Sequence, residues 1–136
     1  MKKISETGFT LLELLVVMVI IGLLVGYVGP KYFAQLGKSE IKTARAQINA
    51  IKKALDVYRL DTGHYPSEEM GLNVLNILPE NEPKWQGPYL EKDLPVDPWG
   101  HPYIYLIPGL KNEIDVFSYG KDGLPGGTDE NADIYN

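Results

Sequence analysis

The chain has 136 residues, a net charge of -5 and no cysteine. This length supports one modest domain, and the lack of cysteine excludes both a disulfide framework and a thiolate metal site. The acidic balance, together with a basic stretch in which aromatic side chains are not interleaved, argues against a nucleic-acid-binding protein.

Charge is unevenly distributed along the chain. Residues 31–60 carry seven basic and two acidic side chains, whereas residues 61–136 carry four basic and fourteen acidic ones. Opposite charge on two parts of one chain favours packing of copies side by side or head to tail. A solvated basic helix followed by a solvated acidic domain explains the same pattern without any packing.

The amino-terminal part contains an apolar run from Phe9 to Pro30, interrupted only by Thr10 and Glu13 among residues that are otherwise apolar, Gly or Pro. Its 22 residues would form a helix of about 33 Å, against a hydrocarbon core of about 30 Å. The run therefore predicts a membrane-spanning helix. Lys2 and Lys3 ahead of it place the N-terminus in the cytoplasm, although the lysines beyond the run weaken that orientation.

Glu13 is the most unusual residue of this run. An ionised carboxylate inside a bilayer costs about 2.5–3.5 kcal/mol on insertion scales, so a partner is expected. The nearest available cation would be an ammonium at Phe9, which exists only if the peptide bond after Gly8 is cut. A conventional signal peptide is cut after its apolar stretch, whereas Gly8 precedes this one.

The hexapeptide Gly8-Phe9-Thr10-Leu11-Leu12-Glu13 resembles the processing motif of type IV pilins and type II secretion pseudopilins. The resemblance implies that a dedicated aspartyl prepilin peptidase removes residues 1–8 on the cytoplasmic side and methylates the new terminus at Phe9. It also implies that Glu13 pairs with the terminus of a neighbouring subunit. Pro30 lies where the family commonly has a helix-kinking proline. A plain transmembrane anchor is the alternative.

Gly22 and Gly26 have the GxxxG spacing of a close helix-packing face. They also weaken the helix beside Pro30, so that it could stretch or melt. We favour the second interpretation.

After Pro30 the pattern becomes amphipathic. Apolar residues recur at helical spacing, which predicts a stripe made of Ile41, Ala44, Ile48, Ile51, Leu55 and Tyr58. Phe9 to Leu60 would form one helix of about 78 Å, and Asp61-Thr62-Gly63 supplies a stop signal. A coiled-coil dimer is the alternative interpretation of the stripe.

The remaining residues predict a small head. Ser67 would cap a short helix whose inward face carries Leu72, Leu75 and Leu78, and residues 79–102 predict an irregular connection. Tyr103–Ile107 and Ile114–Tyr119 predict a β-hairpin, followed from Gly120 by a loop. The predicted fold is α+β and pilin-like: a long N-terminal helix packed on a small antiparallel sheet.

The head is similar to that of the major (G-type) pseudopilins of type II secretion. The similarity lies in Tyr65-Pro66 with Gly71-Leu72, in Asp97-Pro98-Trp99-Gly100 with Tyr103, and in residues 115–123. It implies a structural subunit that polymerises with its own copies into a periplasmic filament and drives export of folded proteins. The implied partners are minor pseudopilins and an inner-membrane platform with its ATPase. We interpret the Asp-Pro-Trp-Gly group itself as a turn with a buried Trp.

The same resemblance implies a structural calcium ion in the C-terminal loop. The matching ligands are Asp122 and Asp133 with the carbonyls of Tyr119 and Leu124, all hard oxygens of the kind that calcium prefers. Some relatives have a second acid where this chain has Ala132. The substitute ligands considered are Thr128, Asp129 and Glu130. From spacing alone, this loop would be only a solvated acidic turn.

The predicted organisation is a leader at 1–8, a membrane or filament-core helix at 9–30, and a periplasmic domain at 31–136, divided into a stem (31–60) and a head (61–136). The location implied is the bacterial inner membrane, crossed once. Two isolated histidines lack zinc spacing, and no nucleophile-elbow motif occurs, so no enzyme is predicted. The alternatives are a type IV pilin of a surface fibre or DNA-uptake apparatus, and a membrane-tethered binding module.

Overall fold

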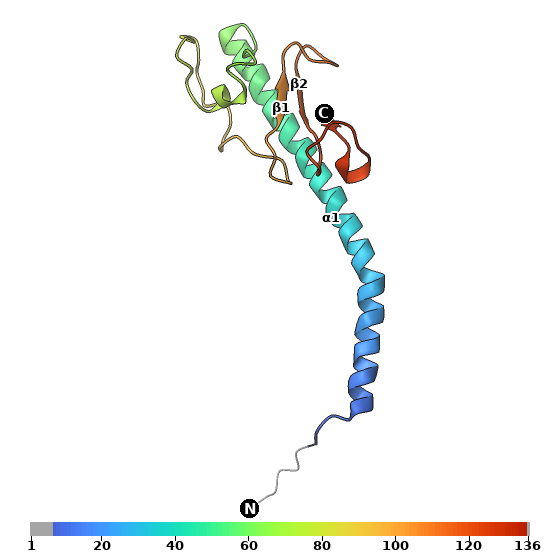
Figure 1. The fold of residues 1–136 in the computed structure, drawn as a ribbon. Coiled ribbons are helices and arrows are strands. Elements are labelled where there is room, and N and C mark those ends of the chain that lie inside the picture. The colour runs from blue at the N-terminus through green and yellow to red at the C-terminus, as the bar shows by residue number, and fades with distance from the viewer. Residues whose placement is uncertain (1–6, 136) are drawn as a thin grey trace, which may run out of the picture. The chain divides into compact units, whose positions relative to one another are not determined.

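The computed structural model describes residues 7–135, so most of the predicted leader lies outside the described residues. The chain divides into two compact units, one ending at Gly37 and the other beginning at Lys38. A single helix, α1 (Leu11–Thr62), contributes to both units, and the second unit also contains a small sheet (Figure 1).

Helix α1 has 52 residues, the length predicted, and begins and ends two residues later than expected. It continues without a break through the glycines and Pro30. The stop signal is confirmed: the Gly63 N–H donates to the Arg59 carbonyl at 2.8 Å, and Gly63 has a φ of 88°. A glycine just past the last turn adopts this left-handed conformation without a Cβ clash.

The second half of α1 buries the predicted stripe. Ala44, Ile48, Ile51, Leu55 and Tyr58 are all fully buried, and the partly buried Ile41 packs against them. Burial of each large apolar side chain stabilises the fold by about 1.5–3 kcal/mol. Because these residues recur every three or four positions, they face one side of the helix, where the rest of the second unit packs.

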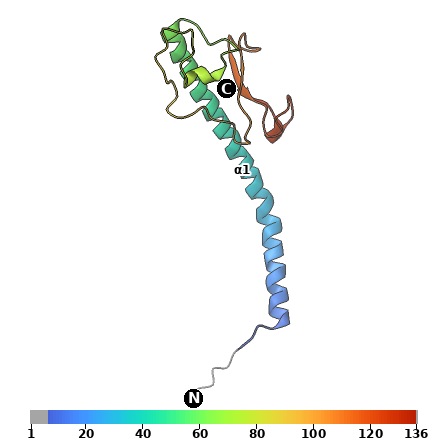
Figure 2. The ribbon, with the colours of Figure 1, turned by 60° about the vertical axis from the view of Figure 1, so that its left-hand side comes forward.

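The sheet has three antiparallel strands in the order β1-β2-β3: β1 (Ile104–Leu106), β2 (Asp115–Ser118) and β3 (Ile134–Tyr135). The first two confirm the predicted hairpin, with Tyr105 opposite Val116. The last strand was not predicted, because two residues after a Gly- and Asp-rich segment give no detectable alternation. Tyr135 lies opposite Phe117, and their rings stack with centroids 4.6 Å apart. In both ribbon views the hairpin lies alongside α1 (Figures 1 and 2).

The predicted short helix after Ser67 is wrong in extent. Ser67 caps a single turn, in which its Oγ accepts from the Met70 N–H at 3.3 Å. Gly71, with a φ of 61°, ends that turn, and only a 3₁₀ segment follows, η1 (Leu72–Leu75). Leu72 and Leu75 are buried as predicted, but Leu78 is 61% exposed. It lies beyond the end of η1 and so does not share its inward face.

The turn between β1 and β2 is organised by Asp115, which is 1% exposed. Its carboxylate accepts the backbone N–H groups of Leu110 at 2.6 Å, Lys111 at 2.8 Å and Asn112 at 3.2 Å, together with the Asn112 amide. Burial disfavours the charged form, but these hydrogen bonds outweigh it and hold the pKa of Asp115 below its ordinary value. The folded protein therefore binds this proton less well than the unfolded chain does.

Replacement Asp115→Asn should destabilise the protein by about 2–3 kcal/mol, because an amide NH₂ would face backbone donors in a buried site. A carboxyl group whose pKa is depressed by folding stabilises the protein above its unfolded pKa, and this stabilisation is lost as the pH falls through the folded pKa. The difference between wild type and variant should therefore shrink below about pH 4. Thermal unfolding of the full chain in detergent, followed by circular dichroism across pH, measures it. A difference that does not depend on pH would contradict the proposed role of the charge.

Candidate functional site

The first unit begins with a capping box. The Glu13 N–H donates to Thr10 Oγ1 at 3.2 Å, and Glu13 Oε2 accepts from the Thr10 N–H at 2.9 Å. In such a box the first and fourth residues of a helix start satisfy one another's free backbone donors. Glu13 therefore has a local hydrogen-bond partner that was not predicted, although the Thr-x-x-Glu spacing was visible in the sequence. The hydrogen bonds of the box satisfy backbone donors, but they do not neutralise the negative charge of Glu13.

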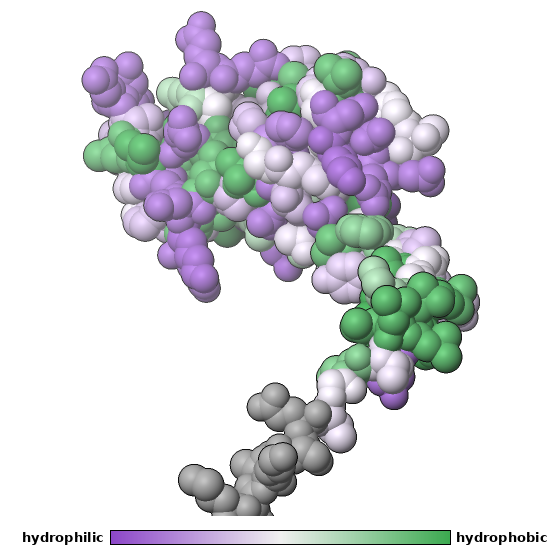
Figure 3. All heavy atoms as spheres, turned by 60° about the horizontal axis from the view of Figure 1, so that its bottom comes forward, coloured by the Kyte–Doolittle hydropathy of each residue, from purple (hydrophilic) through white to green (hydrophobic). Residues whose placement is uncertain are grey.

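The apolar run is uncovered in the single chain. From Phe9 to Leu36 every Leu, Ile, Val, Met, Phe and Tyr side chain is at least 45% exposed. Helix α1 is long and apolar enough to cross a membrane, and its most apolar window contains no buried residue. Figure 3 shows hydrophobic atoms gathered on this segment, whereas the visible face of the head is largely hydrophilic. A contiguous apolar surface of this size marks a lipid or protein contact.

Gly8 and Phe9 both lie ahead of α1, outside any helix or strand, and both are exposed. The peptide bond between them is thus in an exposed stretch without regular secondary structure, where a peptidase could reach it. Met1 to Glu6, which would form most of the leader, lie outside the described residues.

The predicted calcium ligands all lie on one loop, residues 119–133, between β2 and β3. Asp122 Oδ1 accepts from the Leu124 N–H at 3.1 Å, and both carboxylate oxygens of Asp133 accept from the Gly126 N–H at 3.1 Å. Glu130 is paired with Lys121 at 2.8 Å. Thr128 and Asp129 are exposed and belong to the start of a 3₁₀ turn, η2 (Asp129–Asn131).

The loop folds back so that its two arms touch. Gly120 has a φ of 77°, and a Cβ there would lie 2.7 Å from the Ala132 carbonyl oxygen and 2.9 Å from that of Glu130. Only glycine allows this approach. Within residues 7–135 no group of three or more His, Cys, Asp or Glu side chains is placed to hold a metal. Two carboxylates on two adjoining arms, supplemented by backbone carbonyls, remain chemically suited to calcium.

The Asp-Pro-Trp-Gly group is a turn, as interpreted, but its Trp is only partly buried. Asp97 Oδ1 accepts from the Trp99 N–H at 3.1 Å and from the His101 N–H at 2.8 Å. The indole Nε1 of Trp99 donates to Glu40 Oε2 on α1 at 3.0 Å. The turn therefore presents the indole to the helix as a hydrogen-bond donor in addition to packing there.

These features define a class: a pilin-like subunit, with one long N-terminal helix whose first part is apolar and preceded by a processing motif. Comparison with known families agrees. The model of the prokaryotic N-terminal methylation motif matches residues 4–28, and the model described as type II secretion system (T2SS), protein G matches residues 31–136. The chain belongs to this protein G family and is a major pseudopilin of the type II secretion system, a structural and non-enzymatic protein.

Individual relatives support the assignment. The chain is 43% identical to type II secretion system core protein G of Pseudomonas aeruginosa, over all of this chain and 98% of that protein. It is 46% identical to core protein G of Vibrio cholerae, over all of this chain and 95% of that protein. Among solved structures, it resembles the major pseudopilin of enterohaemorrhagic Escherichia coli with a TM-score of 0.63 and 38% identity, covering 75% of this chain and 86% of that one.

Proposed function

We propose that the chain is made as a precursor and cut between Gly8 and Phe9, after which Phe9 is methylated and the mature subunit polymerises into a helical filament in the periplasm. Growth of this filament would drive export of folded proteins across the outer membrane. The observation that carries the proposal is the exposed apolar run beginning at Phe9. Outside lipid, such a surface needs a protein partner to cover it, and neighbouring copies carry the same apolar run.

Glu13 sets the register of such a filament in this proposal. An ammonium at Phe9 of one copy and the carboxylate of another are each costly in an apolar core, and they offset one another when paired. Their meeting selects one axial offset between copies. The capping box supports this role, because it fixes the carboxylate at the helix start, next to where a new terminus would be.

The membrane arrangement follows from the same sequence. Residues 1–8 would be a cytoplasmic leader and residues 9–30 would cross the inner membrane once before entering the filament core. Residues 31–136 would be periplasmic, with a stem at 31–60 and a head at 61–136. The partners proposed are further copies, minor pseudopilins, the prepilin peptidase, and the inner-membrane platform with its ATPase. Membership of a secretion-system family and the methylation motif support these partners.

The C-terminal loop would hold one structural calcium ion. Asp122 and Asp133 are its proposed carboxylate ligands, with the carbonyls of Tyr119 and Leu124. Thr128 or Asp129 would complete the set in preference to Glu130, whose carboxylate is already paired with Lys121. Bound calcium would cross-link the two arms of the loop and stabilise the folded head, because the unfolded chain offers no such set of oxygens.

The intact mass of the mature protein tests processing. We expect it to correspond to residues 9–136 with one added methyl group on the amine of Phe9. Replacement Gly8→Ala should leave residues 1–8 attached, and a conservative change outside the matched motif, Lys2→Arg, should not. A functional protein that retains its leader would contradict the proposal.

Three substitutions separate the two roles of Glu13. Glu13→Ala removes the charge and the cap, whereas Glu13→Gln removes the charge but keeps an acceptor for the Thr10 N–H. Thr10→Ala removes the hydroxyl cap, which costs about 1 kcal/mol, and keeps the charge. We expect processing in all three, and filaments by electron microscopy only in wild type and Thr10→Ala. Filaments of normal register in Glu13→Gln would exclude charge pairing.

Removal of calcium should lower the melting temperature of the full chain in detergent. A ligand at 100 times its dissociation constant stabilises the protein by about 2.7 kcal/mol, which shifts the melt by roughly 10–20 °C for a domain of this size. Asp122→Ala should melt at the same low temperature with or without calcium, while Asp93→Asn, an exposed acid outside the loop, should respond like wild type. A wild-type melt that chelator leaves unchanged would refute the metal site.

A further inference from the structure

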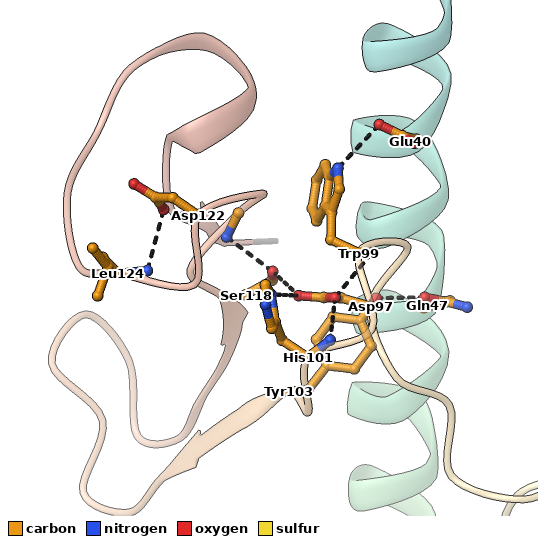
Figure 4. A network of polar contacts seen from close by, with 10 residues as sticks. Glu40, Gln47, Asp97, Trp99, His101, Tyr103, Ser118, Asp122 and Leu124 are labelled. Atoms are coloured by element: carbon orange, nitrogen blue, oxygen red, sulfur yellow. Dashed lines mark hydrogen bonds and ion pairs between the residues drawn. The ribbon is translucent and has the colours of Figure 1, made fainter.

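Asp97 is a buried carboxylate that joins two segments of the second unit, its own turn and β2. Its side chain is fully buried. Oδ1 accepts the two N–H groups of its own turn, and Oδ2 accepts the Ser118 hydroxyl of β2 at 2.7 Å. Figure 4 shows the carboxylate between the turn and β2. Loss of any one donor would leave a buried charge underbonded, so the segments that supply the donors are held together.

The network extends into the C-terminal loop. Ser118 Oγ, also fully buried, accepts from the Gly120 N–H at 3.1 Å, and Gly120 is the residue against which the far arm of the loop packs. His101 adds a second contact. A Cβ at Gly123 would lie 3.1 Å from the imidazole Cε1, and the buried His101 Nδ1, which has no hydrogen bond, lies 3.7 Å from Asp97 Oδ2.

In the other direction the network reaches α1. The Trp99 indole donates to Glu40, and the Tyr103 hydroxyl donates to the Gln47 side-chain oxygen. Burial, with Asp97 nearby, raises the pKa of Tyr103, which keeps this hydroxyl protonated as a donor. Glu40 and Gln47 are seven positions apart, two helical turns, and so lie on one face of α1. Through Trp99 the turn of Asp97 is hydrogen-bonded to α1 at Glu40, and Tyr103, which follows this turn in the chain, adds a separate hydrogen bond two helical turns away, at Gln47.

We propose that Asp97 is a positioning residue that holds the C-terminal loop in place on α1 and couples calcium in that loop to the stem surface at Glu40 and Gln47. The calcium half rests on the metal site proposed above. Because coupling between two sites is reciprocal, weakening the stem end of the network must weaken calcium binding, although the stem makes no contact with the metal ligands in the network described. A purely structural Asp97 would not transmit this effect.

The test uses the full chain in detergent, with amide hydrogen exchange of the loop and calorimetric titration with calcium chloride. Ser118→Ala removes one hydroxyl and little volume, so the chain should still fold. We expect exchange within residues 119–133 to accelerate at least tenfold and calcium affinity to fall about tenfold. Trp99→Phe, which removes the donor to Glu40 together with part of the packed indole ring, should lower calcium affinity about threefold. Asp93→Asn, an exposed acid of the preceding segment, should match wild type in both measurements.

The outcomes separate the positioning role of Asp97 from the coupling between calcium and the stem. Wild-type exchange and affinity in a folded Ser118→Ala variant would overturn the positioning role. If exchange accelerates in Ser118→Ala but Trp99→Phe binds calcium with wild-type affinity, the coupling to the stem is overturned and the positioning role of Asp97 is retained. If the wild-type chain binds no calcium, the metal site and the coupling both fail, and the exchange measurement alone decides whether Asp97 positions the loop.

Discussion

The burial of one apolar stripe of α1 is the interaction on which the folded head depends. The buried residues of the second half of the helix form the centre of the hydrophobic core, and the hairpin, η1 and the irregular segments all pack against it. The first half of the same helix has no such cover, and all its large apolar side chains are exposed. One helix therefore presents a single apolar stripe to its own chain and an apolar surface on all sides to lipid or to other copies. This difference between its halves is what the proposed order of events, membrane anchoring first and assembly afterwards, would require of a subunit.

The sequence predicted the elements that rest on long periodic patterns. The helical stripe, the length of α1 and the two strands of the hairpin were all expected, because each is specified by several residues at regular spacing. The processing motif was identified in a different way, from the resemblance of residues 8–13, next to an apolar run, to the motif of type IV pilins and pseudopilins. The short helix after Ser67 failed as a prediction because Gly71 ends the turn, an effect that three leucines at apparent helical spacing concealed.

Other features could not be predicted because they depend on contacts between distant segments. β3 is only two residues long, and its position is set by the pairing of Ser118 with Ile134 and the stacking of Tyr135 on Phe117. The role of Asp97 likewise requires knowing that β2 passes beside its turn, 21 residues further along the chain. Asp115 follows the Pro108-Gly109 turn in the sequence, but its carboxylate accepts backbone donors that precede it in the chain, which no local turn signal indicates. Its near-complete burial still had to be seen in the structure.

The C-terminal loop depends both on its own sequence and on contacts with distant segments. Its composition of glycine and acidic residues predicts neither order nor disorder by itself. A metal ion acting alone would have to offset the whole entropic cost of closing the loop. In the structure, β3 closes one end of the loop, and the contact of Gly120 with residues 130–132 brings the two arms together. The hydrogen bond from the Gly120 N–H to Ser118 Oγ then joins the network around Asp97 to the arm that carries Asp122. Because protein contacts have already ordered much of the loop, calcium would need to order only the remaining part, and its affinity would depend on residues that never touch the ion. The loop and the stem are therefore expected to act as one unit, and a change at the stem should alter the affinity of the proposed calcium ligands for the ion.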